Sequence, residues 1–86
     1  MLADDFRPGI YEHYKSTEKD RRYYLVLGKA RHTETEEILV AYVPMYFEPT
    51  HPGPRIQVRP FKMFIEEVEW EGKVVPRFRY IGQEIG

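Results

Sequence analysis

Cysteine is missing from this chain of 86 residues, which excludes a disulfide framework and any thiolate metal site. Small extracellular domains usually need such staples, so the absence favours a reducing compartment. Long apolar runs are missing too, because the longest, Ile38–Val43, is far too short to span a membrane. The first residues show no basic region followed by an apolar run, as a signal peptide requires. We therefore expect a cytoplasmic protein that does not enter a membrane.

An excess of charge of either sign is also missing. Thirteen lysines and arginines face fourteen aspartates and glutamates, which gives a formal net charge of −1. Proteins that bind duplex DNA usually carry a clear basic surplus. The balance therefore favours a peptide, another protein or a small anionic ligand as the partner over nucleic acid.

The length fits a single domain, which we place over residues 1–86. A domain this short buries only about 60–65% of the surface that its unfolded chain exposes. Aromatic side chains compensate, because seven tyrosines, five phenylalanines and one tryptophan bury a large area per residue. The sequence does not distinguish a monomer from a homodimer.

Apolar residues almost nowhere recur at helical spacing, and short β-rich runs separated by turn signals recur instead. The predicted strands are Ile10–Lys15, Arg22–His32, Ile38–Met45 and Ile56–Arg59. Gly28, inside the second run, predicts a bulge or a bend. Between the runs lie the charged loop Ser16–Arg22 and the proline-rich loop Phe47–Pro54, which cannot pair in a sheet.

The last third of the chain predicts a helical turn followed by a β-hairpin. Pro60 suits the first position of a turn over Pro60–Phe64, where its missing N–H costs nothing. A three-residue loop, Trp70–Gly72, would place Val68 opposite Val74. In that register Phe64 also lies opposite Phe78. One face of the hairpin is then apolar and consists of Phe64, Val68, Trp70, Val74, Phe78 and Tyr80.

Five strands with one short turn between the fourth and the fifth are the element order of an SH3-like barrel. A five-stranded OB barrel is the alternative. It commonly carries a helix between strands three and four, where this chain has its proline-rich loop. We therefore expect an all-β, five-stranded SH3-like barrel with one short helical turn before the last hairpin.

Four motifs occur together in this chain, in the order Pro8–Lys15, Ala30–Thr35, Val58–Pro60 with Met63–Phe64, and Val75–Phe78. From Pro8 to Ile81 the chain resembles a bacterial family of uncharacterised small proteins, domain of unknown function sixteen-fifty-three. The resemblance implies a compact SH3-like β-barrel without an established activity. Two loops, Ser16–Arg22 and Tyr46–Arg55, are longer than the family's usual ones, so a function that depends on their shape is not carried over.

The three histidines are the candidate proton carriers and metal ligands. His13 and His32 lie on the first two predicted strands, and His51 lies in the proline-rich loop. A zinc site needs about four ligands, and the histidine spacing matches no metal-binding motif. We therefore expect no metal and no cofactor, and histidines that are hydrogen-bonded to backbone or carboxylate. The only serine, Ser16, lies in the charged loop, so we name no catalytic residue.

Two arginines are candidates for binding an anion. Arg31 begins a run to Glu36 that combines a cation, an imidazole, hydroxyls and carboxylates, a mixture suited to an anionic ligand or to a solvated turn. Arg59 precedes the helical turn, where its bidentate fork could bind a carboxylate or a phosphate. The same guanidinium could instead pair with Glu12 or Glu36.

The leading hypothesis is a binding or accessory module whose shallow groove receives a peptide or a small anionic ligand. The predicted groove consists of Tyr11, His13, Arg31, His32, Tyr42 and Arg59. One alternative is a small enzyme that uses a histidine as general base. Another is a subunit of a larger assembly or a homodimer, which a flat, exposed apolar patch would indicate.

Overall fold

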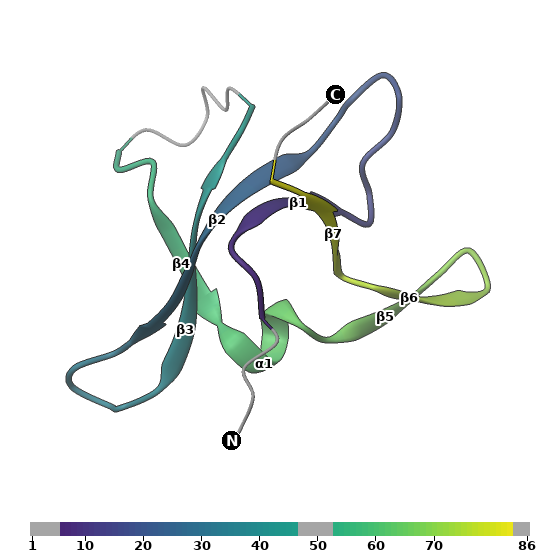
Figure 1. Ribbon diagram of the computed structural model, residues 1–86. Helices are drawn as coiled ribbons and strands as arrows, with labels where there is room; N and C mark the ends of the chain where they lie inside the picture. The colour runs from purple at the N-terminus through teal and green to yellow at the C-terminus, as the bar shows by residue number, and fades with distance from the viewer. Residues whose placement is uncertain (1–5, 47–52, 84–86) are drawn as a thin grey trace.

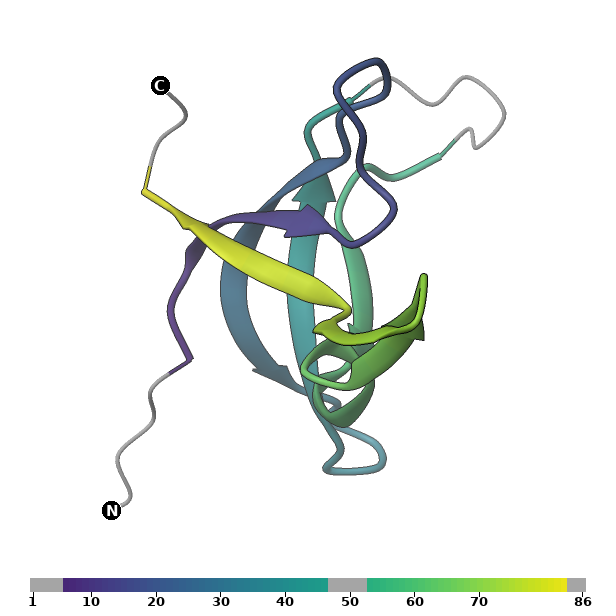
Figure 2. The same cartoon turned by 90° about the vertical axis from the view of Figure 1, so that its right-hand side faces the viewer.

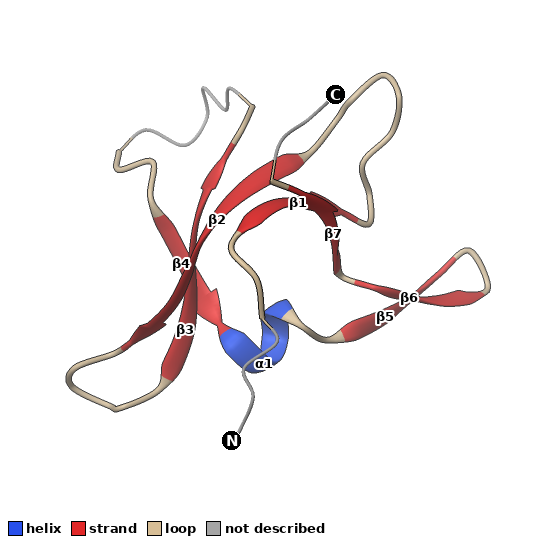
Figure 3. Cartoon of the chain, in the orientation of Figure 1, coloured by secondary structure: helices blue, strands red, loops and turns tan. Residues whose placement is uncertain are grey.

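The computed structural model describes residues 6–46 and 53–83, and within them the chain is almost entirely β-structure (Figure 1; Figure 3). The elements are β1 (Gly9–His13), β2 (Tyr23–Arg31), β3 (Ile38–Pro44), β4 (Gln57–Pro60), α1 (Phe61–Phe64), β5 (Glu67–Trp70), β6 (Lys73–Pro76) and β7 (Phe78–Gly82). The predicted helical turn is confirmed as α1. None of the helical structure in these residues is long or apolar enough to cross a membrane. The predicted all-β class is correct.

Five strands form one antiparallel sheet in the order β4-β3-β2-β1-β7, while β5 and β6 form a separate two-stranded ladder. Figure 2 shows how strongly the large sheet curves. Its two edge strands, β4 and β7, do not pair within the described residues. The expected five-stranded barrel is therefore corrected to a curved, open sheet of five strands with an additional two-stranded hairpin.

The additional strand pair arises because the last predicted strand is divided. Pro76 ends β6, and Arg77 separates it from β7. Pro76 has no N–H to offer a further ladder bond. Arg77 connects the two ladders, because its backbone N–H donates to Glu66 O at 3.0 Å and its O accepts from the Tyr14 N–H at 3.0 Å. The chain then changes partners, so that β6 pairs with β5 and β7 pairs with β1.

The β5–β6 hairpin confirms the predicted hairpin, but its predicted register is wrong by one residue. The loop has two residues, Glu71 and Gly72, both with positive φ (52° and 79°), as in the tight turns that suit the twist of a hairpin. Trp70 therefore lies opposite Lys73, and Val68 lies opposite Val75 rather than Val74. Sequence reasoning missed this because a glutamate rarely adopts the left-handed conformation.

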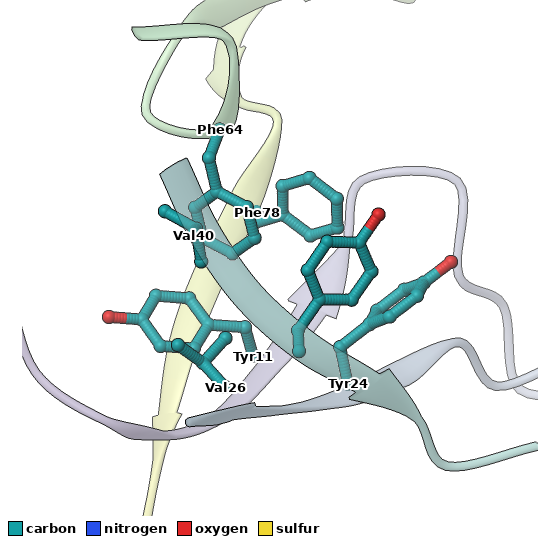
Figure 4. Packing of buried hydrophobic residues seen from close by; sticks show 7 residues of the cluster. Tyr11, Tyr24, Val26, Val40, Phe64 and Phe78 are labelled. Carbon is teal, nitrogen blue, oxygen red and sulfur yellow. The ribbon is translucent and has the colours of Figure 1, made fainter. Parts of the chain in front are cut away.

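The hydrophobic core lies against the concave side of the large sheet (Figure 4). Its buried members are Tyr11, Tyr24, Val26, Val40, Tyr42, Phe64 and Phe78. Phe64 is 1% exposed and stacks on Phe78 with ring centroids 4.2 Å apart and planes at 4°. Burial of a ring this size stabilises the fold by about 2–3 kcal/mol. The single turn of α1 thus serves to place Phe64 in the core.

The tyrosines give this core a polar rim on two sides. In Figure 4 the hydroxyls of Tyr11 and Tyr24 point away from the cluster in opposite directions. The Tyr11 hydroxyl donates to Arg7 O at 2.7 Å, and the Tyr24 hydroxyl lies 2.8 Å from the Tyr46 hydroxyl. The buried rings therefore carry polar groups to the surface at both ends.

The start of β1 lies against the end of β7. A Cβ on Gly9, whose φ is 139°, would lie 2.8 Å from Gly82 O, so only glycine permits this approach. Gln83 Nε2 donates to Pro8 O at 3.0 Å. Pro8 and Gln83 are thus held in direct contact although 75 positions separate them.

A candidate anion-binding cleft

The structure does not bring the six predicted groove residues together. Tyr11 and Tyr42 are core residues, 7% and 4% exposed. Arg31 and His32 lie exposed at the turn between β2 and β3. There His32 Nδ1 accepts hydrogen bonds from the backbone N–H groups of residues 34 and 35, at 3.1 and 3.3 Å. Arg31 and His32 therefore behave as the solvated turn that the sequence also allowed.

Arg59 lies elsewhere, on the inward-facing side of β4, and shares a cleft with Tyr42. The cleft has a volume of about 360 Å³ and lies where β2 begins and β3 ends. Its lining residues are Arg22, Tyr24, Tyr42, Pro44, Tyr46, Pro54, Arg55, Gln57 and Arg59. Three guanidinium groups thus line one cleft, and its described lining contains no carboxylate.

Two of the three arginines are already engaged. Arg55 Nη2 donates to Pro44 O at 2.8 Å and to Tyr46 O at 3.0 Å, which fixes the segment before β4 against the end of β3. Arg22 donates to Asp20 Oδ2 through Nε (3.2 Å) and Nη2 (3.1 Å). The charge of Asp20 offsets that of Arg22, whereas Arg55 has no carboxylate partner among the described residues.

Arg59 is the least satisfied of the three. Its guanidinium carbon lies 5.5 Å from the centroid of the Phe78 ring, and its Nε is buried without an acceptor in the described part of the chain. The carboxylates suggested for it by the sequence are taken, because Glu12 pairs with Arg21 and Arg79, and Glu36 pairs with Arg31. A buried donor without a partner costs about 1–3 kcal/mol.

The cleft also offers hydroxyl donors. The Tyr24 and Tyr46 hydroxyls form one hydrogen bond of 2.8 Å, in which either oxygen can be the donor, so one hydroxyl hydrogen remains to bind a ligand. Burial and the bond to Tyr46 raise the pKa of Tyr24 well above its usual value. Tyr24 therefore stays protonated, and the cleft offers positively charged and neutral donors together.

The cleft residues Arg22 and Arg59 also act on the charge of His13. Burial and the charges of Arg22, Arg59, Lys15 and Arg77 lower the pKa of His13 to about 4. The imidazole is therefore neutral at pH 7, and its Nδ1 accepts the Lys15 N–H at 3.1 Å. Since an efficient general base has a pKa near the working pH, this environment does not favour a catalytic role for His13.

A second cleft, of about 340 Å³, lies beneath the β5–β6 hairpin and contains a satisfied charge. Glu12 is 8% exposed and accepts from Arg21 at 3.0 Å and from Arg79 at 2.8 Å. Burial alone would raise the pKa of Glu12, but hydrogen bonds from Ser16 and Arg21 and the charge of Arg79 hold it below its ordinary value. In the part of the chain described, no three His, Cys, Asp or Glu residues form a group that could hold a metal ion.

The residues that sequence reasoning missed are Arg22, Tyr24, Tyr46 and Arg55. Nothing in the local sequence marks these four residues as a group. Pairing brings them together, since Tyr24 lies opposite Pro44 and Tyr42 lies opposite Gln57. That register depends on contacts between strands far apart in the chain, which no local pattern specifies.

The fold and the cleft define a small all-β domain with a basic pocket at one end of a curved antiparallel sheet. The chain belongs to the family described as protein of unknown function (DUF1653), whose model matches residues 9–80, and the resemblance seen in the sequence is thereby confirmed. A crystal structure of a DUF1653 protein from Bordetella bronchiseptica is similar, with 36% sequence identity, a TM-score of 0.80 and 95% of each chain covered. No curated protein matches the chain.

Proposed function

We propose that this protein is a binding module that takes up an anionic group, a carboxylate or a phosphate of a peptide or small ligand, in the cleft around Arg59. The observation that carries the proposal is the buried Arg59 Nε, which has no acceptor within the described residues. An anion entering the cleft would supply that acceptor. A protein that leaves such a donor unsatisfied retains it at a cost in stability, and binding sites are where such costs are usual.

The chemistry of the lining supports an anion over a cation or an apolar group. Guanidinium groups form bidentate, charge-assisted hydrogen bonds with carboxylates and phosphates. Arg22 and Arg55 flank Arg59 in the same lining, and the Tyr24–Tyr46 pair adds one free hydroxyl hydrogen. A cleft of about 360 Å³ lies at the small end of ligand pockets, so we propose that it receives one compact anionic group.

The proposed site differs from the predicted groove in its members. It retains Tyr42 and Arg59 and adds the four residues that the sequence did not single out. His13 contributes from behind the cleft by remaining neutral, while Tyr11, Arg31 and His32 take no part.

We also propose an SH3-like architecture for the fold. The order β4-β3-β2-β1-β7, with a helical turn between β4 and the final strands, supports it. The β5–β6 hairpin is then an insertion before the last strand. We further propose that the whole chain, 1–86, is one domain and that it acts in the cytoplasm, as the lack of cysteine suggests.

The test is an amide and Arg Nε–H NMR titration with inorganic phosphate and, separately, with acetate, at constant ionic strength maintained with sodium chloride. We expect the Arg59 Nε–H resonance and the amides around Tyr46 and Arg55 to shift together. Arg59→Gln should weaken phosphate binding at least about tenfold, because it removes one charge-assisted interaction.

The matched control is Arg31→Gln, which removes the same charge from an exposed turn outside the cleft. It should leave the affinity within about twofold, since exposed charges act weakly at this range in salt. Equal losses in the two variants, or shifts spread over the whole surface, would show that phosphate responds only to overall charge.

A further inference from the structure

The cleft around Arg59 holds more positive charge than one carboxylate neutralises. Of its three arginines, Arg22 pairs with Asp20. Arg55 donates to two backbone carbonyl oxygens, which carry no net charge. Arg59 forms no ion pair with a described residue, and its Nε is buried without an acceptor there. Two guanidinium charges, those of Arg55 and Arg59, are thus left without a counter-charge in the part of the chain that the structure describes.

The donors of the cleft come from three segments of the chain. These segments are the start of β2, the end of β3, and β4 with the residues before it, and their donor side chains are Arg22, Tyr24, Tyr46, Arg55 and Arg59. A carboxylate has two acceptor oxygens, which lie in one plane with its carbon. A phosphate monoester has three strong acceptor oxygens, and they are arranged tetrahedrally. Donors from three segments therefore suit three diverging oxygens better than two coplanar ones.

We infer that the anion is the phosphate of a phosphate monoester, an inference that rests on the proposed anion binding and narrows it to one class. At pH 7 such a phosphate carries a charge of about −1.5 to −2, which matches the two uncompensated charges of Arg55 and Arg59. A carboxylate would neutralise only one of them and leave the other without a counter-charge in the cleft.

The same charge count separates phosphate monoesters from nucleic acid. Each phosphodiester in a DNA or RNA backbone carries a single negative charge, and two of its oxygens are bonded to sugars. The cleft has a volume of about 360 Å³, at the small end of ligand pockets, so it admits the phosphate with a few atoms of the molecule that carries it. A terminal phosphate group meets this limit, whereas a phosphate within a continuous strand is flanked by sugars on both sides.

Methyl phosphate, dimethyl phosphate and acetate test the class on the wild type, in the NMR titration described above and at about pH 7.5. Dimethyl phosphate keeps the phosphorus centre but loses one charge and one charged oxygen. Methyl phosphate should bind at least about tenfold more tightly than either of the other two. If dimethyl phosphate or acetate shifts the Arg59 Nε–H at the same concentrations as methyl phosphate, the phosphate-monoester class is overturned while anion binding stands. If none of the three shifts it, the proposed function fails, and the class with it.

Asp20→Asn tests the charge count from the side of the protein. It removes the partner charge of Arg22, so methyl phosphate should bind about three- to fivefold more tightly. The matched control is Glu18→Gln, which removes the same charge from an exposed position of the same loop that forms no ion pair with a described residue. It should leave the affinity within about 1.5-fold. Equal effects of the two variants, or no gain in Asp20→Asn, would overturn the charge count on which the class depends.

A phosphorylated protein and a small phosphorylated metabolite share this chemistry, and two further ligands distinguish them. N-acetylphosphoserine amide represents the first source, and glycerol phosphate represents the second. Both should bind at least about tenfold more tightly than dimethyl phosphate, and the tighter of the two indicates the carrier. If neither exceeds dimethyl phosphate, the phosphate-monoester class is overturned.

Discussion

Glu12 and His13 are neighbours on β1, yet the charges around them are arranged in opposite ways. Glu12 faces one side of the strand and binds two arginines, Arg21 and Arg79, so its cluster of charges is internally satisfied. His13 faces the other side, where burial and then the surrounding positive charges lower its pKa to about 4. Arg21 and Arg79 share one carboxylate, whereas the charged groups that act on the pKa of His13 are all cations.

The difference separates structural arginines from arginines available to a ligand. The carboxylate of Glu12 is buried between two guanidinium groups and stabilises β1. Neither its oxygens nor its two arginines are then available to bind a partner. At the cleft, Arg59 has a buried donor without an acceptor among the described residues. A chain with a formal net charge of only −1 can thus present a cleft whose described lining contains three arginines and no carboxylate.

Removing the carboxylate should break the satisfied cluster. In Glu12→Gln, Arg21 and Arg79 lose their common partner, and we expect the free energy of unfolding to fall by about 2–3 kcal/mol. Urea denaturation followed by circular dichroism measures it. Glu69→Gln, an exposed carboxylate on β5, is the control and should change stability by less than about 0.5 kcal/mol. If Glu12→Gln lowered the free energy of unfolding by less than about 0.5 kcal/mol, the cluster would contribute no more to stability than an exposed ion pair.

Lowering the pH should destabilise the protein through His13, on the other side of β1. The unfolded chain protonates His13 near pH 6.5, whereas the folded protein does so only near pH 4. Between these values the unfolded state binds the extra proton, so stability falls as the pH is lowered from about 6.5 to about 4. The lowered pKa of Glu12 adds a further loss below about pH 4.5.

Because the His13 ring keeps contact with solvent, we expect its share of the acid effect to be about 1–2 kcal/mol. Thermal unfolding at several pH values, compared with His13→Asn, isolates that share. Asparagine keeps an acceptor for the Lys15 N–H but does not titrate. If the two proteins lose stability in parallel between pH 6.5 and 4, His13 is not the group responsible.

Tyr46→Phe should affect both stability and the cleft. The variant leaves the buried Tyr24 hydroxyl without the partner that now lies 2.8 Å away, and we expect a loss of about 1 kcal/mol. The cleft also loses one hydroxyl, so phosphate should bind about two- to fivefold more weakly. Thermal unfolding and the NMR titration measure the two effects on the same sample. An unchanged unfolding curve would mean that solvent already satisfies Tyr24.

Arg59→Met best separates an arginine that binds a ligand from one that stabilises the fold. Of the variants considered, it should change stability least. Methionine keeps the apolar contact with Phe78 and removes the unsatisfied donor, so stability should stay within about 0.5 kcal/mol of the wild type or rise slightly. Phosphate binding should be lost. The unfolding free energy is decisive here: a fall of 2 kcal/mol or more would make Arg59 a structural residue and remove the main support for the cleft.

Local patterns in the sequence were sufficient for most of the elements. Alternating apolar residues marked the strands, Gly28 marked the bulge where the β2–β3 register shifts, and Pro60 marked α1. The predicted hairpin register was wrong because Glu71 takes a conformation that glutamate rarely adopts. The predicted barrel was wrong because the edge strands β4 and β7 do not pair within the described residues. Local chemistry therefore specified where strands lie but not how the sheet ends.

The site was harder to predict because it is assembled from three separate segments. Arg31 and His32 were attractive as a dense polar run, but such a run also satisfies its own turn. Arg55 gave no signal, since its role comes from reaching back to Pro44 O and Tyr46 O across the end of β3. His51 and most of the proline-rich loop lie outside the described residues. Only the strand register brings Arg55 and Arg59 to Tyr24, since Tyr42 lies opposite Gln57 and Pro44 lies opposite Tyr24.

The contact between Pro8 and Gln83 holds the start of β1 beside the end of β7, so the chain enters and leaves the large sheet at nearly the same point. A chain that enters and leaves a domain at one point can be inserted into a loop of a host protein without forcing that loop apart. A peptide that joins residues 6 and 83 would keep Phe6 packed against the core, while new ends are opened at an exposed turn, such as Glu71–Gly72. The fold is thus suited to circular permutation and to use as an insert between two halves of a reporter.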